Sequence, residues 1–131
     1  MDEEQLEQFA EQPEVVLDPG DYTLRIEEVQ IAYDRLSIRP LCIVVGGDSD
    51  GKKVCPETYD FHEGGENAAA IRNLYGWGVT KEELMSTDGD VTSIGALLEG
   101  RLGRVSLQQR ENELGDVVNT HEPGAIEPIA Q

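Results

Sequence analysis

The chain has 131 residues, 27 of them acidic and 10 basic, so its formal net charge is −17. That length accommodates one domain and is too short for two ordinary ones. No stretch approaches the roughly 18 apolar residues of a membrane helix. An isoelectric point near 4.2 excludes a broadly basic nucleic-acid binder, because such a charge repels phosphate at long range.

The N-terminal residues are acidic, and they lack the basic start and apolar run of a secretory signal. We therefore expect a cytoplasmic protein that does not enter a membrane. Residues 1–18 hold seven acidic groups and no basic group, a local charge of −7. This composition predicts a flexible, solvated tail. The alternative is a segment that folds when it meets a partner, since Leu6, Phe9 and Ala10 have the spacing of a short helical apolar stripe.

A β pattern begins after Pro19 and Gly20. Apolar residues alternate with polar ones from Tyr22 to Ile26, and then alternate with the opposite parity from Val29 to Tyr33. One extra residue at Glu27-Glu28 accounts for the change and predicts a β-bulge. A bend at that point allows one long strand to pair on both sides of a small barrel.

Two further strands are predicted at residues 36–45 and 53–61, separated by the turn sequence GGDSDGKK. Each contains a proline, Pro40 and Pro56, which indicates an edge or an irregular position. Within the turn, D-S-D-G is typical of a tight hairpin and lacks the further ligands of a calcium loop.

The middle of the chain predicts three short helices, each with a capping residue before it. Asn67 precedes a helix over 68–75, Thr80 and Glu83 form a capping box for 81–86, and Asp90 precedes 91–99. Trp77, between two glycines, is expected to fill the space between helix and barrel.

The β pattern returns with strands predicted at 102–107 and 116–120, after which the chain has two prolines and no periodicity. We therefore divide the chain into an acidic tail (1–18), one domain (19–123) and an irregular C-terminal tail (124–131). Three strands, a helical insertion and two strands are the order of the OB-fold, a five-stranded Greek-key barrel. The alternative is an α+β sandwich with an open sheet.

The two cysteines, Cys42 and Cys55, are expected to be reduced, because a disulfide-stapled secreted domain of this size usually has more. A turn near Ser49 brings them roughly opposite each other, so a disulfide is the alternative. A zinc site that adds His62 and His121 has no supporting spacing. We expect no metal and no cofactor.

No catalytic constellation is present in the sequence. Asp60, His62 and Glu63 cluster at the end of the third strand, and a histidine between carboxylates can act as a general base. However, no serine or cysteine nucleophile has a recognisable context, so a loop histidine is the preferred interpretation and the protein is expected not to be an enzyme.

Basic residues are scarce and gather in three windows, at 35–53, 67–81 and 101–110. In an OB-fold, strands two and three form the usual face for single-stranded nucleic acid, where aromatic rings stack on bases and cations meet phosphates. The residues predicted to bind nucleic acid are Tyr33, Arg35, Arg39, Lys52, Lys53, Tyr59, Arg104 and Arg110. The competing interpretation is that Phe61 and one of the tyrosines belong to the core, because the chain has few aromatics to fill it.

The stretch from Pro19 to Pro123 resembles a family of small bacteriophage proteins long labelled a domain of unknown function and encoded among phage replication and recombination genes. The resemblance lies in PGDYTLRI at 19–26, DGKKV at 50–54, AAAIRNL at 68–74 followed by Gly76, GALLEGRLGRV at 95–105 and NELGDVVN at 112–119. It implies an OB-like protein that binds single-stranded DNA.

The sequence therefore predicts a single-stranded-DNA-binding protein of phage replication or recombination, whose acidic tail covers the basic strip or recruits a replication or recombination protein. The rival is an acidic protein-interaction module, either a virion component or a DNA mimic. Basic windows that converge on one groove lined by aromatics would favour DNA binding. Windows that are scattered and paired with carboxylates would favour the rival.

Overall fold

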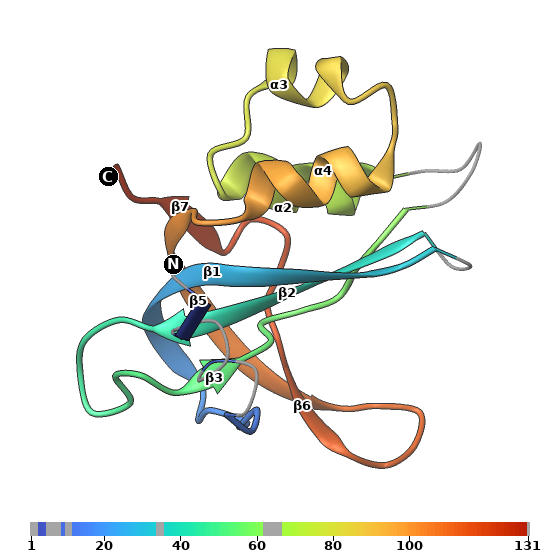
Figure 1. Ribbon diagram of the computed structural model, residues 1–131. Coiled ribbons are helices and arrows are strands. Elements are labelled where there is room, and N and C mark those ends of the chain that lie inside the picture. Colours follow the sequence, from blue (N-terminus) through green and yellow to red (C-terminus); the bar gives the residue numbers. More distant parts are fainter. Residues whose placement is uncertain (1–2, 5–8, 10–11, 34–35, 62–66, 131) are drawn as a thin grey trace.

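A computed structural model describes residues 3–4, 9, 12–33, 36–61 and 67–130 of the chain. In these residues the fold is mainly β, with short helices packed to one side of an antiparallel sheet (Figure 1). The strands are β1 (Gly20–Ala32), β2 (Ser37–Val44), β3 (Lys53–Val54), β4 (Tyr59–Asp60), β5 (Leu102–Glu111), β6 (Val117–Thr120) and β7 (Ile126–Pro128). The helices are α2 (Ala68–Gly76), α3 (Lys81–Ser86) and α4 (Val91–Leu98).

The strand order is β3-β2-β1-β5-β6, with β4 also paired to β2 and β7 also paired to β5. The central strand, β1, pairs with β5 through residues 20–25 and with β2 through residues 24–32. Its register shifts between Ile26 and Glu28. This confirms the predicted bulge and the prediction that one long strand pairs on both sides.

Two strand predictions need correction. The third strand, expected at 53–61, is divided into β3 and β4, and Pro56 lies in the gap, where a residue without an N–H cannot donate to a ladder. The C-terminal residues, expected to be irregular, contain β7, which pairs with β5 at Gly103–Val105. Ile126 is buried there because Gly76 and Gly103 leave space for its side chain.

The helices lie between β4 and β5 in the chain, as predicted. The Thr80–Glu83 capping box is formed, and the Asp90 side chain accepts a hydrogen bond from the Ser93 amide at the start of α4. Helix α4 packs directly on β1, since a Cβ added at Gly95 would lie 3.1 Å from Cγ1 of Val29. None of the helices in the described part of the chain has the length and apolarity needed to cross a membrane.

The core lies between the helices and the inner face of the curved sheet. Trp77 is 1% exposed, and its ring lies over Gly103 of β5, where an added Cβ would approach Cζ3 to 2.9 Å. This confirms its predicted place between helix and sheet. The most deeply buried side chains also include Leu24, Ile26, Ile38, Leu41, Tyr59, Leu74, Leu98 and Leu107.

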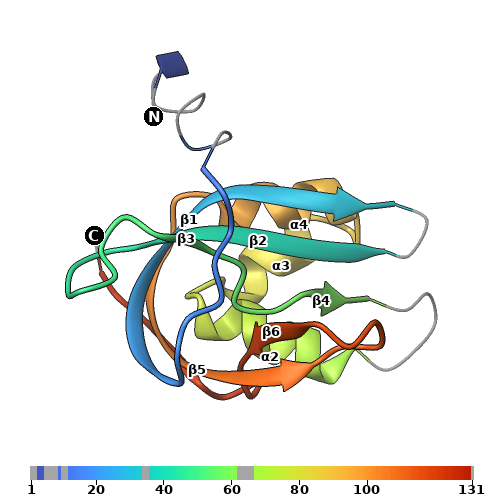
Figure 2. The same ribbon diagram turned by 90° about the horizontal axis from the view of Figure 1, so that it is seen from below.

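Residues before Pro19 also belong to the packed structure. The amide of Val15 donates to the carbonyl oxygen of Lys53 at 2.9 Å, and Leu17 is 4% exposed. The Asn119 side chain accepts from the Leu17 amide at 2.8 Å and donates to its carbonyl oxygen at 2.9 Å. These residues therefore differ from the flexible tail expected for 1–18, because backbone groups of the segment are satisfied by β3 on one side and β6 on the other (Figure 2).

Among the described residues, the ladder of named strands ends at β3 and at β6, so the sheet is open between them apart from the bridge of residues 14–15 to Lys53. Side chains span this gap. Glu57, in the segment between β3 and β4, accepts a hydrogen bond from the Thr120 hydroxyl of β6 and lies 3.5 Å from the Arg110 guanidinium of β5. The two ends of the sheet are therefore held together by side-chain contacts and by residues 14–17.

Candidate nucleic-acid interface

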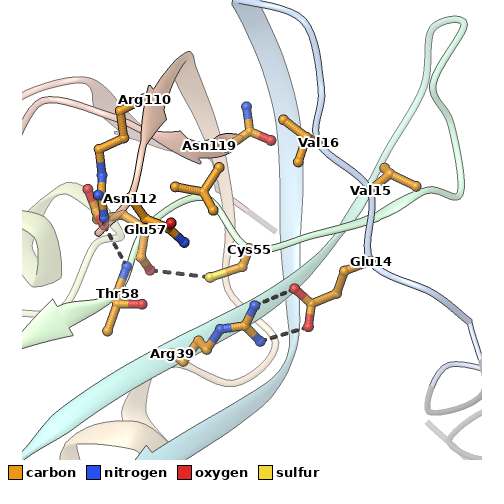
Figure 3. A pocket seen from close by; sticks show the side chains of 11 residues that line it. Glu14, Val15, Val16, Arg39, Cys55, Glu57, Thr58, Arg110, Asn112 and Asn119 are labelled. Atoms are coloured by element: carbon orange, nitrogen blue, oxygen red, sulfur yellow. Dashed lines mark hydrogen bonds and ion pairs between the residues drawn. The ribbon is translucent and has the colours of Figure 1, made fainter. Parts of the chain in front are cut away.

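A groove of about 430 Å³ lies over the gap between the two ends of the sheet (Figure 3). Arg39 enters it from β2, Arg110 from β5, and Asn119 from β6, while Cys55 and Thr58 belong to the segment between β3 and β4. A second hollow, of about 750 Å³, shares Arg39 and Thr58 with the first. It is also lined by residues 30–32 of β1, so it lies beside the first hollow on the side of the β1–β2 hairpin.

Arg39 is held by a carboxylate from outside the sheet. Both of its terminal nitrogens donate to Glu14, one of them at 2.7 Å, and one also donates to Gln30 at 3.2 Å. These hydrogen bonds lower the pKa of Glu14 and raise that of Arg39. The side chains remain 35% and 37% exposed, so the pair is accessible to competing anions.

Arg110 is paired more loosely, at 3.5 Å from Glu57. The Glu57 carboxylate has other partners, since it also accepts hydrogen bonds from the Thr120 hydroxyl and, at 2.9 Å, from the Thr58 amide. The guanidinium of Arg110 contributes one contact to this carboxylate and is 49% exposed. Arg110 is therefore the more available of the two groove arginines.

Lys53 lies next to the groove but is buried. Its ammonium group donates to the carbonyl oxygen of Phe9 at 3.2 Å and lies 4.5 Å from the centre of the Phe9 ring. Lysine is rarely so buried without a partner, and here a carbonyl and an aromatic face together replace water. Lys53 is thus covered by the N-terminal segment and is not open to solvent.

The predicted aromatic residues do not form a stacking surface in the groove. Tyr59 was predicted to stack on bases, but it is 1% exposed, so that prediction is wrong for the folded chain and the core interpretation of this tyrosine is confirmed. Tyr33 is 65% exposed near the β1–β2 hairpin, where its hydroxyl accepts a hydrogen bond from Thr92. Phe61 is 9% exposed and packs in the core.

The remaining predicted residues are dispersed. Lys52 is exposed, and Arg104 lies 3.7 Å from Asp21 in a different hollow, beside the turn at 46–49. Arg35 is outside the described residues. The three basic windows therefore converge only in part. Arg39 and Arg110 reach one groove, Arg104 lies in a different hollow, and no described residue of the window at 67–81 lines the groove.

Carboxylates accompany most of the arginines that the structure describes. The pairs are Arg25–Glu27, Arg39–Glu14, Arg101–Glu83, Arg104–Asp21 and Arg110–Glu57. The sequence did not indicate three residues that contact these cations although they are distant from them in the chain. Phe9 contacts Lys53, Glu14 contacts Arg39 and Glu57 contacts Arg110. No local pattern around these residues indicates which cation each will meet.

The cysteines are both free thiols. Cys42 pairs with Val54 across the hairpin, so Cys55 is one residue out of register with it. Burial raises the pKa of Cys42 and raises that of Cys55 to about 11, which makes both poor nucleophiles at neutral pH. Among the described residues, no group of three or more His, Cys, Asp or Glu side chains is placed to hold a metal. His62 and Glu63, considered above, lie outside the described residues.

A buried chain of hydrogen bonds links Trp77 after α2, Tyr59 of β4 and His121 after β6. The Trp77 indole N–H donates to the Tyr59 hydroxyl at 2.9 Å, and that hydroxyl lies 2.8 Å from Nε2 of His121. Nδ1 of His121 lies 2.9 Å from the carbonyl oxygen of Glu122, which can only accept. The neutral ring with its proton on Nδ1 therefore satisfies every member of the chain, since Nε2 is then free to accept from Tyr59.

This arrangement predicts a pH dependence of stability. Burial lowers the pKa of His121 below its ordinary value of 6.5, so the unfolded chain takes up a proton at higher pH than the folded one. The contribution of His121 is then complete above pH 6.5 and is lost as pH falls from there toward the lowered folded pKa. We expect the stability advantage of the wild type over His121→Gln to shrink in that window, by at most about 1.4 kcal/mol per pH unit for one proton. Urea unfolding of both proteins at several pH values measures this, and a constant difference would contradict the assignment.

Neither a scan against protein-family models nor a search of curated proteins finds a match to this chain.

Proposed function

We propose that the protein is a non-enzymatic, OB-like module that binds single-stranded DNA along the groove between the two ends of its sheet. The observation that carries this proposal is that Arg39 and Arg110, from two separate basic windows, line one groove. An OB-like barrel is supported by the strand order, by the bulged β1 that pairs on both sides, and by the side-chain contacts of Glu57 across the open gap.

In this proposal the phosphates meet the arginines, and the polar walls of the two hollows contact sugars and bases. Thr58 lines both hollows and Gln30 lines the second, so these polar side chains are placed to contact the strand between Arg110 and the hairpin. Because the net charge is −17 and the groove contains its own carboxylates, binding is expected to be weak. The arginine–phosphate contacts should nevertheless strengthen as salt falls, because they release counterions from the strand.

The test is a fluorescence-anisotropy titration of labelled oligo-dT with the full chain at low and high salt. Arg110→Ala is expected to weaken binding by about fivefold to tenfold and to reduce the salt slope by about 0.7, the value for one phosphate contact on a single strand. Arg72→Ala is the matched control, since it removes the same charge from an exposed position on α2 outside the groove. Equal losses in the two variants would contradict binding in the groove.

A second candidate is the acidic protein-interaction module, a virion component or a DNA mimic. The ion pairs of five arginines favour this candidate. An arginine that is already paired with a carboxylate is less available to phosphate, and the excess of acidic groups then dominates the surface. This module would leave oligo-dT unbound at every salt concentration and in every groove variant.

A further inference from the structure

The N-terminal strap, by which we mean Phe9 together with residues 12–17, crosses the outer edge of β3 and ends at β6 (Figure 2). The Gln12 side chain donates to the carbonyl oxygen of Gly51, and Val15 donates to that of Lys53. Glu14 forms a parallel bridge with Lys53. The strap is thus docked beside the groove by backbone and side-chain hydrogen bonds.

Two side chains of the strap contact two cations that were predicted to bind nucleic acid. The Glu14 carboxylate receives both terminal nitrogens of Arg39, a geometry that guanidinium groups also use with phosphate (Figure 3). The Phe9 ring faces the ammonium group of Lys53. An anion on the arginine and an aromatic ring beside the lysine are the two chemical groups that a nucleotide presents, a phosphate and a base.

Leu17 and the Glu14 side chain are held differently. Leu17 is 4% exposed, and its backbone is bound on both sides by Asn119 and also accepts from the Gln109 side chain at 3.0 Å. Glu14 and Arg39 are each more than one-third exposed, so a competing anion can reach them. The Glu14 carboxylate can therefore leave Arg39 while Leu17 stays anchored. Phe9 is also 4% exposed, so a strand must lift its ring from Lys53 before it reaches that cation.

We propose that the N-terminal strap is an intramolecular nucleotide mimic, in which Glu14 occupies a phosphate subsite at Arg39 and Phe9 occupies the place of a base beside Lys53. Single-stranded DNA displaces both side chains and leaves Leu17 in place. This inference rests on the proposed function and adds its regulation, because a strand must compete with the strap before it reaches these cations.

The experiment compares full-length Glu14→Gln with full-length Glu4→Gln in the oligo-dT titration. Both substitutions remove one negative charge, but Glu4 is exposed and lies outside the groove lining. We expect Glu14→Gln to bind about threefold to tenfold more tightly than wild type at low salt, as expected for loss of one partly exposed ion pair and of its repulsion of phosphate. Glu4→Gln should change the affinity by less than about twofold, because its charge acts only through solvent.

Two further measurements separate competition from a general effect of charge. In the Arg39→Ala background, Glu14→Gln should raise the affinity for oligo-dT no more than Glu4→Gln does, because the phosphate subsite at Arg39 is gone. On addition of oligo-dT to the wild type, amide exchange at Val15 should accelerate while that at Leu17 stays slow.

The outcomes distinguish the strap from the function itself. If the wild type binds oligo-dT and Glu14→Gln behaves like Glu4→Gln, the strap is not a competitor, although the DNA-binding proposal stands. If amide exchange at Val15 does not change when oligo-dT binds, the proposed displacement of the strap is also overturned. If neither the wild type nor Glu14→Gln binds at low salt, both proposals fail and the acidic interaction module is the better account.

Discussion

Trp77→Ala is expected to lower the free energy of unfolding by about 3–5 kcal/mol, the range for deletion of a large aromatic side chain from a close-packed core. Trp77 is 1% exposed and its ring lies over Gly103, so its removal leaves a cavity beside a residue that has no side chain. Its loss also leaves the buried Tyr59 hydroxyl without the indole donor. Urea unfolding followed by circular dichroism measures the change.

The matched control is Tyr75→Ala, which removes an aromatic ring two residues earlier in the chain. Tyr75 lies on α2 and is 43% exposed, so its loss should cost less than about 1 kcal/mol. Trp77→Phe should fall between the two variants, since it keeps much of the packing but not the hydrogen bond to Tyr59. Similar losses for Trp77→Ala and Tyr75→Ala would contradict the structural role of Trp77.

Asn119→Ala is expected to destabilise the protein by about 2–4 kcal/mol, because it removes partners from several buried backbone groups at once. The Asn119 amide satisfies both the N–H and the C=O of Leu17 and also donates to the carbonyl oxygen of Gln108 at 3.1 Å. Alanine can replace none of these contacts. The same variant should accelerate amide exchange at Leu17, since the anchor of the strap is lost.

Gln108→Ala is the control for this variant. Gln108 is exposed in β5, directly opposite Thr120 of β6, so its side chain can be removed without leaving a buried group unsatisfied. A change within about 0.5 kcal/mol is expected. If Asn119→Ala were as mild as Gln108→Ala and left Leu17 exchange slow, residues 14–17 would not be anchored to β6 as described.

The features predicted correctly from the sequence depend on residues that are close together in the chain. The capping box joins Thr80 to Glu83, and the bulge is indicated by a change of alternation around Glu27 and Glu28. Such signals are complete within one turn of helix or one stretch of strand, so no knowledge of the tertiary fold is needed to interpret them. The same holds for the placement of the helices between the third and fourth predicted strands.

Alternation along a strand was less informative about the candidate site. It assigns residues to two faces but does not say which face the core will cover, and a shift of one residue exchanges them. Tyr59 was therefore as good a candidate for an exposed stacking residue as for a core residue. In the folded chain its hydroxyl meets Trp77 and His121, which lie 18 and 62 residues away in the sequence.

The mainly-β organisation, the helical insertion, the acidic surface and the scarcity of cations all follow from composition and local patterns of the chain. Which cations share a groove, and which groups hold them, depends on contacts made in the folded protein. Arg39 meets Glu14 across 25 residues, and Leu17 meets Asn119 across 102. Such pairs depend on how the sheet curves and on where its two ends meet, and ion pairing between distant residues has no periodicity that a linear pattern can reveal. The strap lies at the open gap, because the N-terminal segment satisfies backbone and side-chain groups that β3 and β6 leave unpaired there.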